Sequence, residues 1–257
     1  MPSLEGAHLK LIRAKRHIDE LRLAIQSYFG STPYRIVKQE NFSGDLVYSV
    51  EITQPIPSEL GAMVGDAIHN MRSALDLLAW QLVVVGGGKP SKNTYFPFTQ
   101  AQVNFKATAN SCLKGASKKS IKFIRRLKPW VGGNRTLLQL HTLDIIDKHQ
   151  VILIVGTAYK NIVLTFQMQV PWQDQVVKFP PIGLKPADRQ FPLKDGSELY
   201  RVNAAARSGT MHDEPQFTFE ACFGEEGNVE GPPLIPTLEN ILNHVTRIIQ
   251  ITDKFLI

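Results

Sequence analysis

The sequence has 257 residues, of which 43% are hydrophobic and 20% charged, so it can bury a core in one large domain or two small ones without disulfide staples. Its two cysteines, Cys112 and Cys222, follow no Cys-x-x-Cys pattern, which argues against a zinc site or a disulfide framework and favours a reduced cytoplasm. No apolar run approaches the roughly 18 residues of a membrane span, and the N-terminus is charged where a signal peptide would be apolar. We therefore expect a cytoplasmic protein with no membrane partner.

The net charge of +6 comes from one part of the chain. Residues 77–143 contain no Asp or Glu, whereas acidic residues outnumber basic ones in the rest of the sequence. This window, which we call the acid-free window, holds Lys89, Lys92, Lys106, Lys114, Lys118, Lys119, Lys122, Arg125, Arg126, Lys128 and Arg135. Such asymmetry is typical of a protein that binds RNA or another polyanion, and the alternative is a solvated surface without a partner.

The chain begins with a predicted helix over residues 3–29. Apolar residues recur there at spacings of three and four and form one stripe, which consists of Leu4, Ala7, Leu11, Ala14, Ile18, Leu21, Ile25 and Tyr28. A stripe of this kind packs another helix. It predicts either a position inside a helical bundle or a homodimer formed through this helix.

A β-hairpin is predicted over residues 34–53, with its turn at Asn41 to Asp45. The next helix spans about 58–85, with Ser58 as a possible cap and the sequence GGGKP as its end. That glycine run is not a phosphate-binding loop, because Pro90 follows Lys89 where the motif requires Ser or Thr.

Residues 90–116 lack periodicity and are expected to be irregular, and two further helices are predicted at 117–127 and 135–150. Residues 151–230 are rich in β-formers, and a C-terminal helix over 236–256 begins with Thr237 as its expected N-cap. The predicted fold class is α+β. Its domains are a helical region over 1–150 that contains the hairpin, a β-rich segment over 151–230, and the C-terminal helix packed on the helical region.

Two stretches place polar residues on otherwise apolar helices. The first, DAIHNMRSALDLLAW over residues 66–80, puts Asp66, His69, Asn70, Ser73 and Asp76 on one stripe with Arg72 at its margin. The second, HTLDIIDKH over residues 141–149, puts His141, Asp144 and Lys148 on one face, with Asp147 and His149 beside it.

Three interpretations of these polar residues remain open. They form a structural network in which each buried charge is paired, for example Asp66 or Asp76 with Arg72 or Lys148. They bind a metal, although no Glu-x-x-His spacing supports this and we predict neither metal nor cofactor. Or they perform acid–base chemistry on a phosphodiester, with a histidine moving the proton and Arg72 stabilising the developing charge.

The motif DAIHNMRSALDLLAWQL, followed by LHTLDIIDKHQ, resembles an uncharacterised family of bacterial proteins whose arrangement is similar to that of HEPN domains. HEPN domains are helical bundles, and their RNase members carry an Arg-x4-6-His motif. Arg72 matches the arginine of that motif, whereas Leu77 stands where the histidine would be. The resemblance therefore implies a helical scaffold with reduced or absent nuclease activity, unless His69 or His149 substitutes.

From these observations the sequence predicts an RNA- or polyanion-binding protein. The alternatives are a metal-independent RNase that uses His69, Arg72 and His149, and a non-catalytic interaction protein that dimerises through its N-terminal helix. The candidate catalytic residues are His69, Asn70, Arg72, Asp76, Asp144 and His149. The candidate nucleic-acid-binding residues are Lys118, Lys119, Lys122, Arg125 and Arg126.

Overall fold

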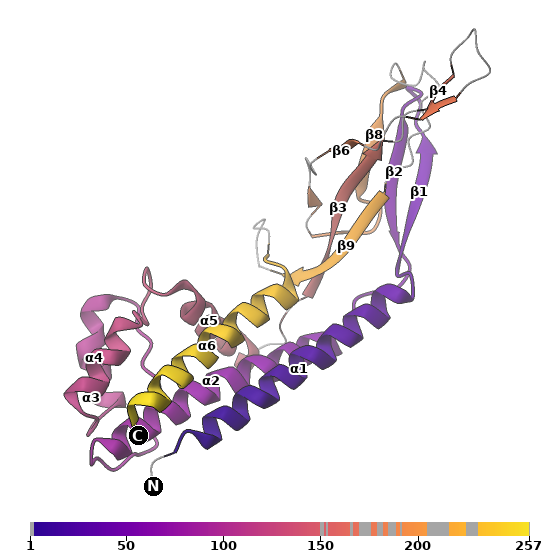
Figure 1. Ribbon diagram of the computed structural model, residues 1–257. Helices are drawn as coiled ribbons and strands as arrows, with labels where there is room; N and C mark the ends of the chain where they lie inside the picture. Colours follow the sequence, from indigo (N-terminus) through magenta and orange to yellow (C-terminus); the bar gives the residue numbers. More distant parts are fainter. Residues whose placement is uncertain are drawn as a thin grey trace. The chain divides into compact units, whose positions relative to one another are not determined.

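The fold is α+β, as the sequence predicts, in a computed structural model that divides into two compact units (Figure 1). Unit 1 comprises residues 1–24, 58–152 and 234–257, and unit 2 comprises residues 25–57 and 153–233. The structure describes residues 3–149, 152, 154–164, 167–169, 176–178, 182–184, 189–190, 192–204, 216–224 and 231–256. Parts of the predicted 151–230 segment, including 205–215 and 225–230, lie outside these described residues.

Unit 1 is helical. Its elements are most of α1 (Glu5–Gly30), α2 (Glu59–Val85), the short 3-10 helix η1 (Gln102–Asn104), α3 (Phe105–Cys112), α4 (Lys118–Arg126), α5 (Arg135–His149) and α6 (Leu234–Leu256). Helix α2 packs against both α5 and α6, and α5 also packs against α6. Two ion pairs join α1 to α6: Arg22 to Glu239 at 2.5 Å and His8 to Asp253 at 3.2 Å.

The apolar stripe of α1 faces the interior of unit 1. The members of the stripe from Leu4 to Leu21 are at most 5% exposed. This burial fits the position inside a helical bundle, one of the two alternatives that the periodicity predicts. Leu9, Ile12 and Leu23 lie off this stripe and are exposed. Among the described residues, no helix is both long and apolar enough to cross a lipid bilayer.

Three details of the helices differ from the sequence prediction. The stretch 90–116 was expected to be irregular but contains α3, whose buried Phe105, Ala109 and Cys112 span too few turns to give a clear period. Helix α6 begins at Leu234 and not at Thr237, because Pro236 needs no hydrogen-bonded N–H in the first turn. Ser58 precedes α2 but makes no side-chain capping hydrogen bond.

The glycine run after α2 is a helix end and a close backbone contact. Gly86 caps α2 by donating its N–H to the carbonyl of Leu82. A Cβ at Gly88 would lie 2.7 Å from the Cα of Gly115, so a larger side chain would separate these two loops. Helix α4 then begins after Ser117, whose side chain accepts the N–H of Ser120 at 3.0 Å.

Unit 2 is built of antiparallel strands. One sheet has the order β1 (Tyr34–Glu40), β2 (Leu46–Ile52) and β8 (Glu198–Val202). In the second sheet β3 (Ile154–Leu164) pairs with β6 (Ile182–Leu184), β7 (Arg189–Gln190) and β9 (Gln216–Phe223), and a separate pair joins β4 (Gln167–Gln169) to β5 (Val176–Lys178).

The predicted hairpin is confirmed, and its turn forms where expected. The Asn41 side-chain oxygen accepts the N–H groups of Ser43 and Asp45, both at 2.9 Å. The hairpin then pairs with β8, so it belongs to unit 2 with the later strands, although the sequence analysis grouped it with the helical region by its position in the chain. Helix α6 returns to unit 1, as the predicted packing on the helical region requires.

Candidate functional site

Helices α2 and α5 lie close together because α2 offers a glycine at their contact. A Cβ at Gly65 would collide with the carboxyl group of Asp147. Burial raises the pKa of Asp147, and the nearby charge of Asp144 raises it further. The close approach brings the polar stripe of α2 against the polar face of α5.

Arg72 is the central charged group of α2 at this contact. It is only 7% exposed, and its Nη2 donates to the carbonyl of Phe96 at 3.1 Å and pairs with Asp76 Oδ1 at 3.0 Å. Asp76 also accepts the N–H of Phe96 at 2.8 Å. Burial raises the pKa of Asp76, while the charge of Arg72 opposes the rise. The ion pair therefore clamps the segment around Phe96 onto α2.

A column of flat groups leads from Arg72 to α5. The guanidinium carbon lies 4.6 Å from the ring centroid of Phe98, and the imidazole of His141 stacks on that ring at 4.4 Å between centroids and 7° between planes. Burial lowers the pKa of His141, and the charge of Arg72 lowers it further. Both effects favour the neutral form of this imidazole.

Asp144 is the buried acid of α5. It is 1% exposed, and Lys148 donates to its Oδ2 at 2.6 Å. Its Oδ1 lies 3.8 Å from Nδ1 of His69 on α2, which is beyond hydrogen-bond distance. The structure thus brings together His69 and Asp144, two residues that the sequence placed on separate helices.

Within the part of the chain that the structure describes, four buried side-chain atoms at this contact have no hydrogen-bond partner. They are Asn70 Oδ1, Arg72 Nη1, His141 Nδ1 and Asp144 Oδ1. An unsatisfied buried polar group costs about 1–3 kcal/mol, and folded proteins leave few of them. We call Asn70, Arg72, Asp76, His141 and Asp144 the α2–α5 cluster; its unpaired atoms are one guanidinium nitrogen, two acceptor oxygens and one imidazole nitrogen.

Asn70 also makes a bond within its own helix, whereas His149 and Leu77 lie outside the cluster. Asn70 Nδ2 donates to the Asp66 carbonyl at 2.8 Å, a bond within α2. His149 is exposed near the end of α5 and makes no hydrogen bond or ion pair with the described part of the chain. Leu77 is half-buried, and its Cδ1 would lie 3.5 Å from a Cβ at Gly6 of α1.

The sequence analysis missed two members of the site and undervalued a third. Phe96 supplies the carbonyl that accepts from Arg72 and the N–H that donates to Asp76, and Phe98 supplies the ring beneath the guanidinium. His141 was noted on its helix face but not chosen as a candidate catalytic residue. The signal that could have found the first two is the aromatic run YFPF inside an otherwise polar stretch.

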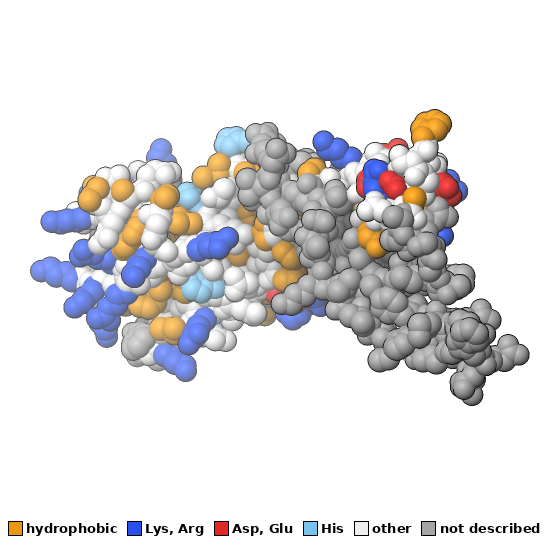
Figure 2. Space-filling view, turned by 90° about the horizontal axis from the view of Figure 1, so that it is seen from above, with side chains coloured by type: hydrophobic (Ala, Val, Ile, Leu, Met, Phe, Trp, Pro, Cys, Tyr) orange, Lys and Arg blue, Asp and Glu red, His pale blue; other side chains and the backbone are white. Residues whose placement is uncertain are grey.

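A second candidate site is the basic surface that the acid-free window forms. All eleven of its Lys and Arg residues are exposed. Lys119 makes an interaction, but no ion pair joins any of the other ten to a described residue. Figure 2 shows Lys and Arg side chains gathered at the end of the helical unit with no acidic side chain among them on that face. This surface is exposed and basic, whereas the charged groups of the α2–α5 cluster are mostly buried.

The described residues contain no group of three or more His, Cys, Asp or Glu that could hold a metal ion. Comparison of the chain with protein-family models, with curated proteins and with solved structures found no match.

Proposed function

We propose that the protein binds single-stranded RNA, or a polyanion of similar charge density, through the basic surface of unit 1. The observation that carries this proposal is the exposure of all eleven basic residues of the acid-free window. The ten of them other than Lys119 form no ion pair with a described residue, so no described carboxylate competes with phosphate for these ten side chains.

Helix α4 supplies the densest part of that surface. Lys118, Lys122, Arg125 and Arg126 are exposed on it, while Ile124 is fully buried and anchors the helix to unit 1. A helix anchored in this way presents its charges at fixed positions, so it can contact several phosphates at once without first becoming ordered.

Nuclease activity on the HEPN-like scaffold is reduced or absent in this proposal. Leu77 occupies the position of the motif histidine and packs towards Gly6 of α1. Leu77 is five positions after Arg72, which places the two about 140° apart around α2 at 100° per residue. A residue at position 77 is thus directed away from the face on which Arg72 contacts Phe96 and Phe98.

The test compares two triple variants in the binding of a fluorescent single-stranded RNA at several salt concentrations. In the first, Lys122, Arg125 and Arg126 become Gln; in the control, Lys10, Arg13 and Arg16 of α1 become Gln. Each phosphate contact contributes about 0.7 to the slope of log K against log salt, so the first variant should lower the magnitude of the slope by about 2.

The control variant carries the same change of net charge, so it should keep the slope of the wild type. Equal slopes for the wild type and the α4 variant, or equal losses in both variants, would refute the proposal. Gel analysis of the RNA after each titration tests the proposal that nuclease activity is reduced or absent. We expect intact RNA. Cleavage by the wild type that is lost in the Arg72→Ala variant would show an active nuclease.

A further inference from the structure

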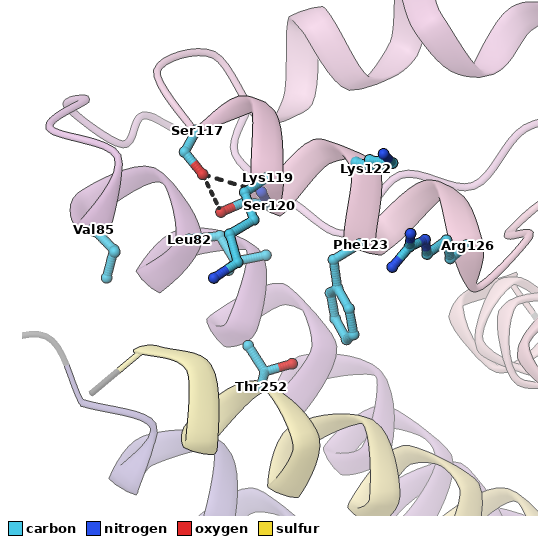
Figure 3. Close-up of a pocket in the computed structure, with 9 residues that line it drawn as sticks. All are labelled: Leu82, Val85, Ser117, Lys119, Ser120, Lys122, Phe123, Arg126 and Thr252. Atoms are coloured by element: carbon cyan, nitrogen blue, oxygen red, sulfur yellow. Dashed lines mark hydrogen bonds between the residues drawn. The ribbon is translucent and has the colours of Figure 1, made fainter.

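A cavity of about 280 Å³ lies between the C-terminal part of α2, helix α4 and helix α6 (Figure 3). It is separate from the α2–α5 cluster and shares no residue with it. Its lining residues are Leu82, Val85, Ser117, Lys119, Ser120, Lys122, Phe123, Arg126 and Thr252.

The walls of the cavity are apolar. Leu82 and Val85 come from α2, and Phe123 extends from α4 towards Thr252 on α6 (Figure 3). The Thr252 hydroxyl donates to the carbonyl of Ile248 at 2.8 Å, so it is already used inside its own helix. A hydrocarbon group placed between these walls would lose its contact with water without stripping any polar group of a partner.

The hydroxyl groups that line the cavity are also engaged. Ser117 and Ser120 share a hydrogen bond at 2.9 Å between their hydroxyl oxygens, and the Ser120 N–H donates to Ser117. A sugar or a nucleobase would need several free donors and acceptors, which these two bonded hydroxyls do not offer. The lining therefore favours an aliphatic group over a polar ring.

Positive charge stands on the α4 side of the cavity. Lys122 and Arg126 are exposed, lie four residues apart on one helix, and form no ion pair with a described residue. Side chains at this spacing have Cβ atoms about 5–6 Å apart, so both can approach one anionic group. No acidic residue occurs between positions 77 and 143 to compete for them.

We propose that this cavity binds a small anionic amphiphile, a molecule with one apolar chain and a carboxylate or phosphate head group. The chain lies between Leu82, Val85 and Phe123, and the head group contacts Lys122 and Arg126. The volume is just below the roughly 300–1,000 Å³ of typical small-molecule sites, which selects a chain of medium length. Lys122 and Arg126 also belong to the basic surface proposed to bind RNA, whereas Leu82, Val85 and Phe123 contact only the chain of the amphiphile.

The first test measures binding of decanoate and of decyl phosphate by calorimetry, below their micelle-forming concentrations. Val85 and Val84 are similarly exposed, at 40% and 36%, but only Val85 lines the cavity. Val85→Trp should fill the cavity and weaken binding by at least about tenfold, whereas Val84→Trp should leave affinity within about twofold. Equal effects of the two substitutions, or no binding of either probe to the wild type, would overturn the proposal.

The second test separates the head group from the chain. The double substitution Lys122→Gln with Arg126→Gln should weaken decanoate, while Lys106→Gln with Lys128→Gln, equally exposed but outside the cavity, should not. Decanol and butanoate should both bind more weakly than decanoate to the wild type. Decanol binding as tight as decanoate would remove the anionic head from the proposal, and equal binding of butanoate would remove the chain; either result overturns it. The stronger of decanoate and decyl phosphate identifies the head group.

Discussion

Unit 1 uses its basic residues in two opposite ways. In the α2–α5 cluster a single guanidinium, Arg72, is 7% exposed and contacts a carbonyl, a carboxylate and a ring. On α4 the basic side chains are exposed, and those other than Lys119 form no ion pair with a described residue. A buried charge needs partners because its desolvation costs several kcal/mol, whereas an exposed charge keeps its water. Stability should therefore depend on the first region and ligand affinity on the second.

The largest effect is expected from Arg72→Met, which keeps most of the side-chain volume but removes the charge. It leaves the Asp76 carboxylate partly buried without its partner and frees the Phe96 carbonyl, so the free energy of unfolding should fall by about 3 kcal/mol. Urea denaturation of the wild type and the variant measures this loss.

A second substitution tests the cause of that loss. In the Arg72→Met background, Asp76→Asn removes the unpaired charge but keeps an oxygen to accept the Phe96 N–H, so it should restore part of the stability. A surface ion pair contributes at most about 1 kcal/mol. A loss below that value for Arg72→Met would mean that the Arg72–Asp76 pair contributes no more to stability than an exposed pair.

The local parts of the fold were predictable from sequence, and the long-range parts were not. The α1 stripe and the Asn41 turn follow from spacings and side-chain bonds within a few residues. The pairing of β2 with β8 joins segments about 150 residues apart, and no local pattern encodes it. The same limit applies to the site. The polar faces of α2 and α5 could each be predicted from the spacing of their residues, but only the fold shows that Phe98 lies between Arg72 and His141.

An intermediate effect is expected from pH, through two histidines of unit 1. Burial lowers the pKa of both His141 and His244, with Arg72 and Arg247 adding to the shifts. The side-chain amide of Asn134 donates to the ring of His244 at 2.9 Å, because its oxygen already accepts the Leu137 N–H, so this imidazole must stay neutral to accept.

In the unfolded chain a histidine takes up its proton near pH 6.5, before these two do so in the folded protein. The contribution of these two histidines to the free energy of unfolding should thus be highest above that pH, and it should fall as the pH drops through it and towards the lower pKa values of the folded state. His141→Phe keeps a ring against Phe98 but cannot titrate, so denaturation curves from pH 7 to pH 5 should show a shallower fall. An unchanged pH dependence in this variant would show that His141 is not held neutral by the α2–α5 cluster.

The smallest effects, and the sharpest check on the exposed region, come from the two ends of α4. Lys118 is in the first turn, where the helix dipole is positive, and Arg126 is in the last turn, where it is negative. Each lies four residues from Lys122, so both experience the same kind of like-charge neighbour, and replacement by Gln changes helix propensity little. Lys118→Gln should therefore raise the free energy of unfolding by about 0.3 kcal/mol and Arg126→Gln should lower it by about the same amount.

High salt should shrink the difference in stability between the two variants, because the interaction of an exposed charge with the helix end is screened. Thermal denaturation of both variants at low and high salt measures this difference, and a change above about 1 kcal/mol in either would mean that the α4 charges support the fold as Arg72 does and are not reserved for a ligand.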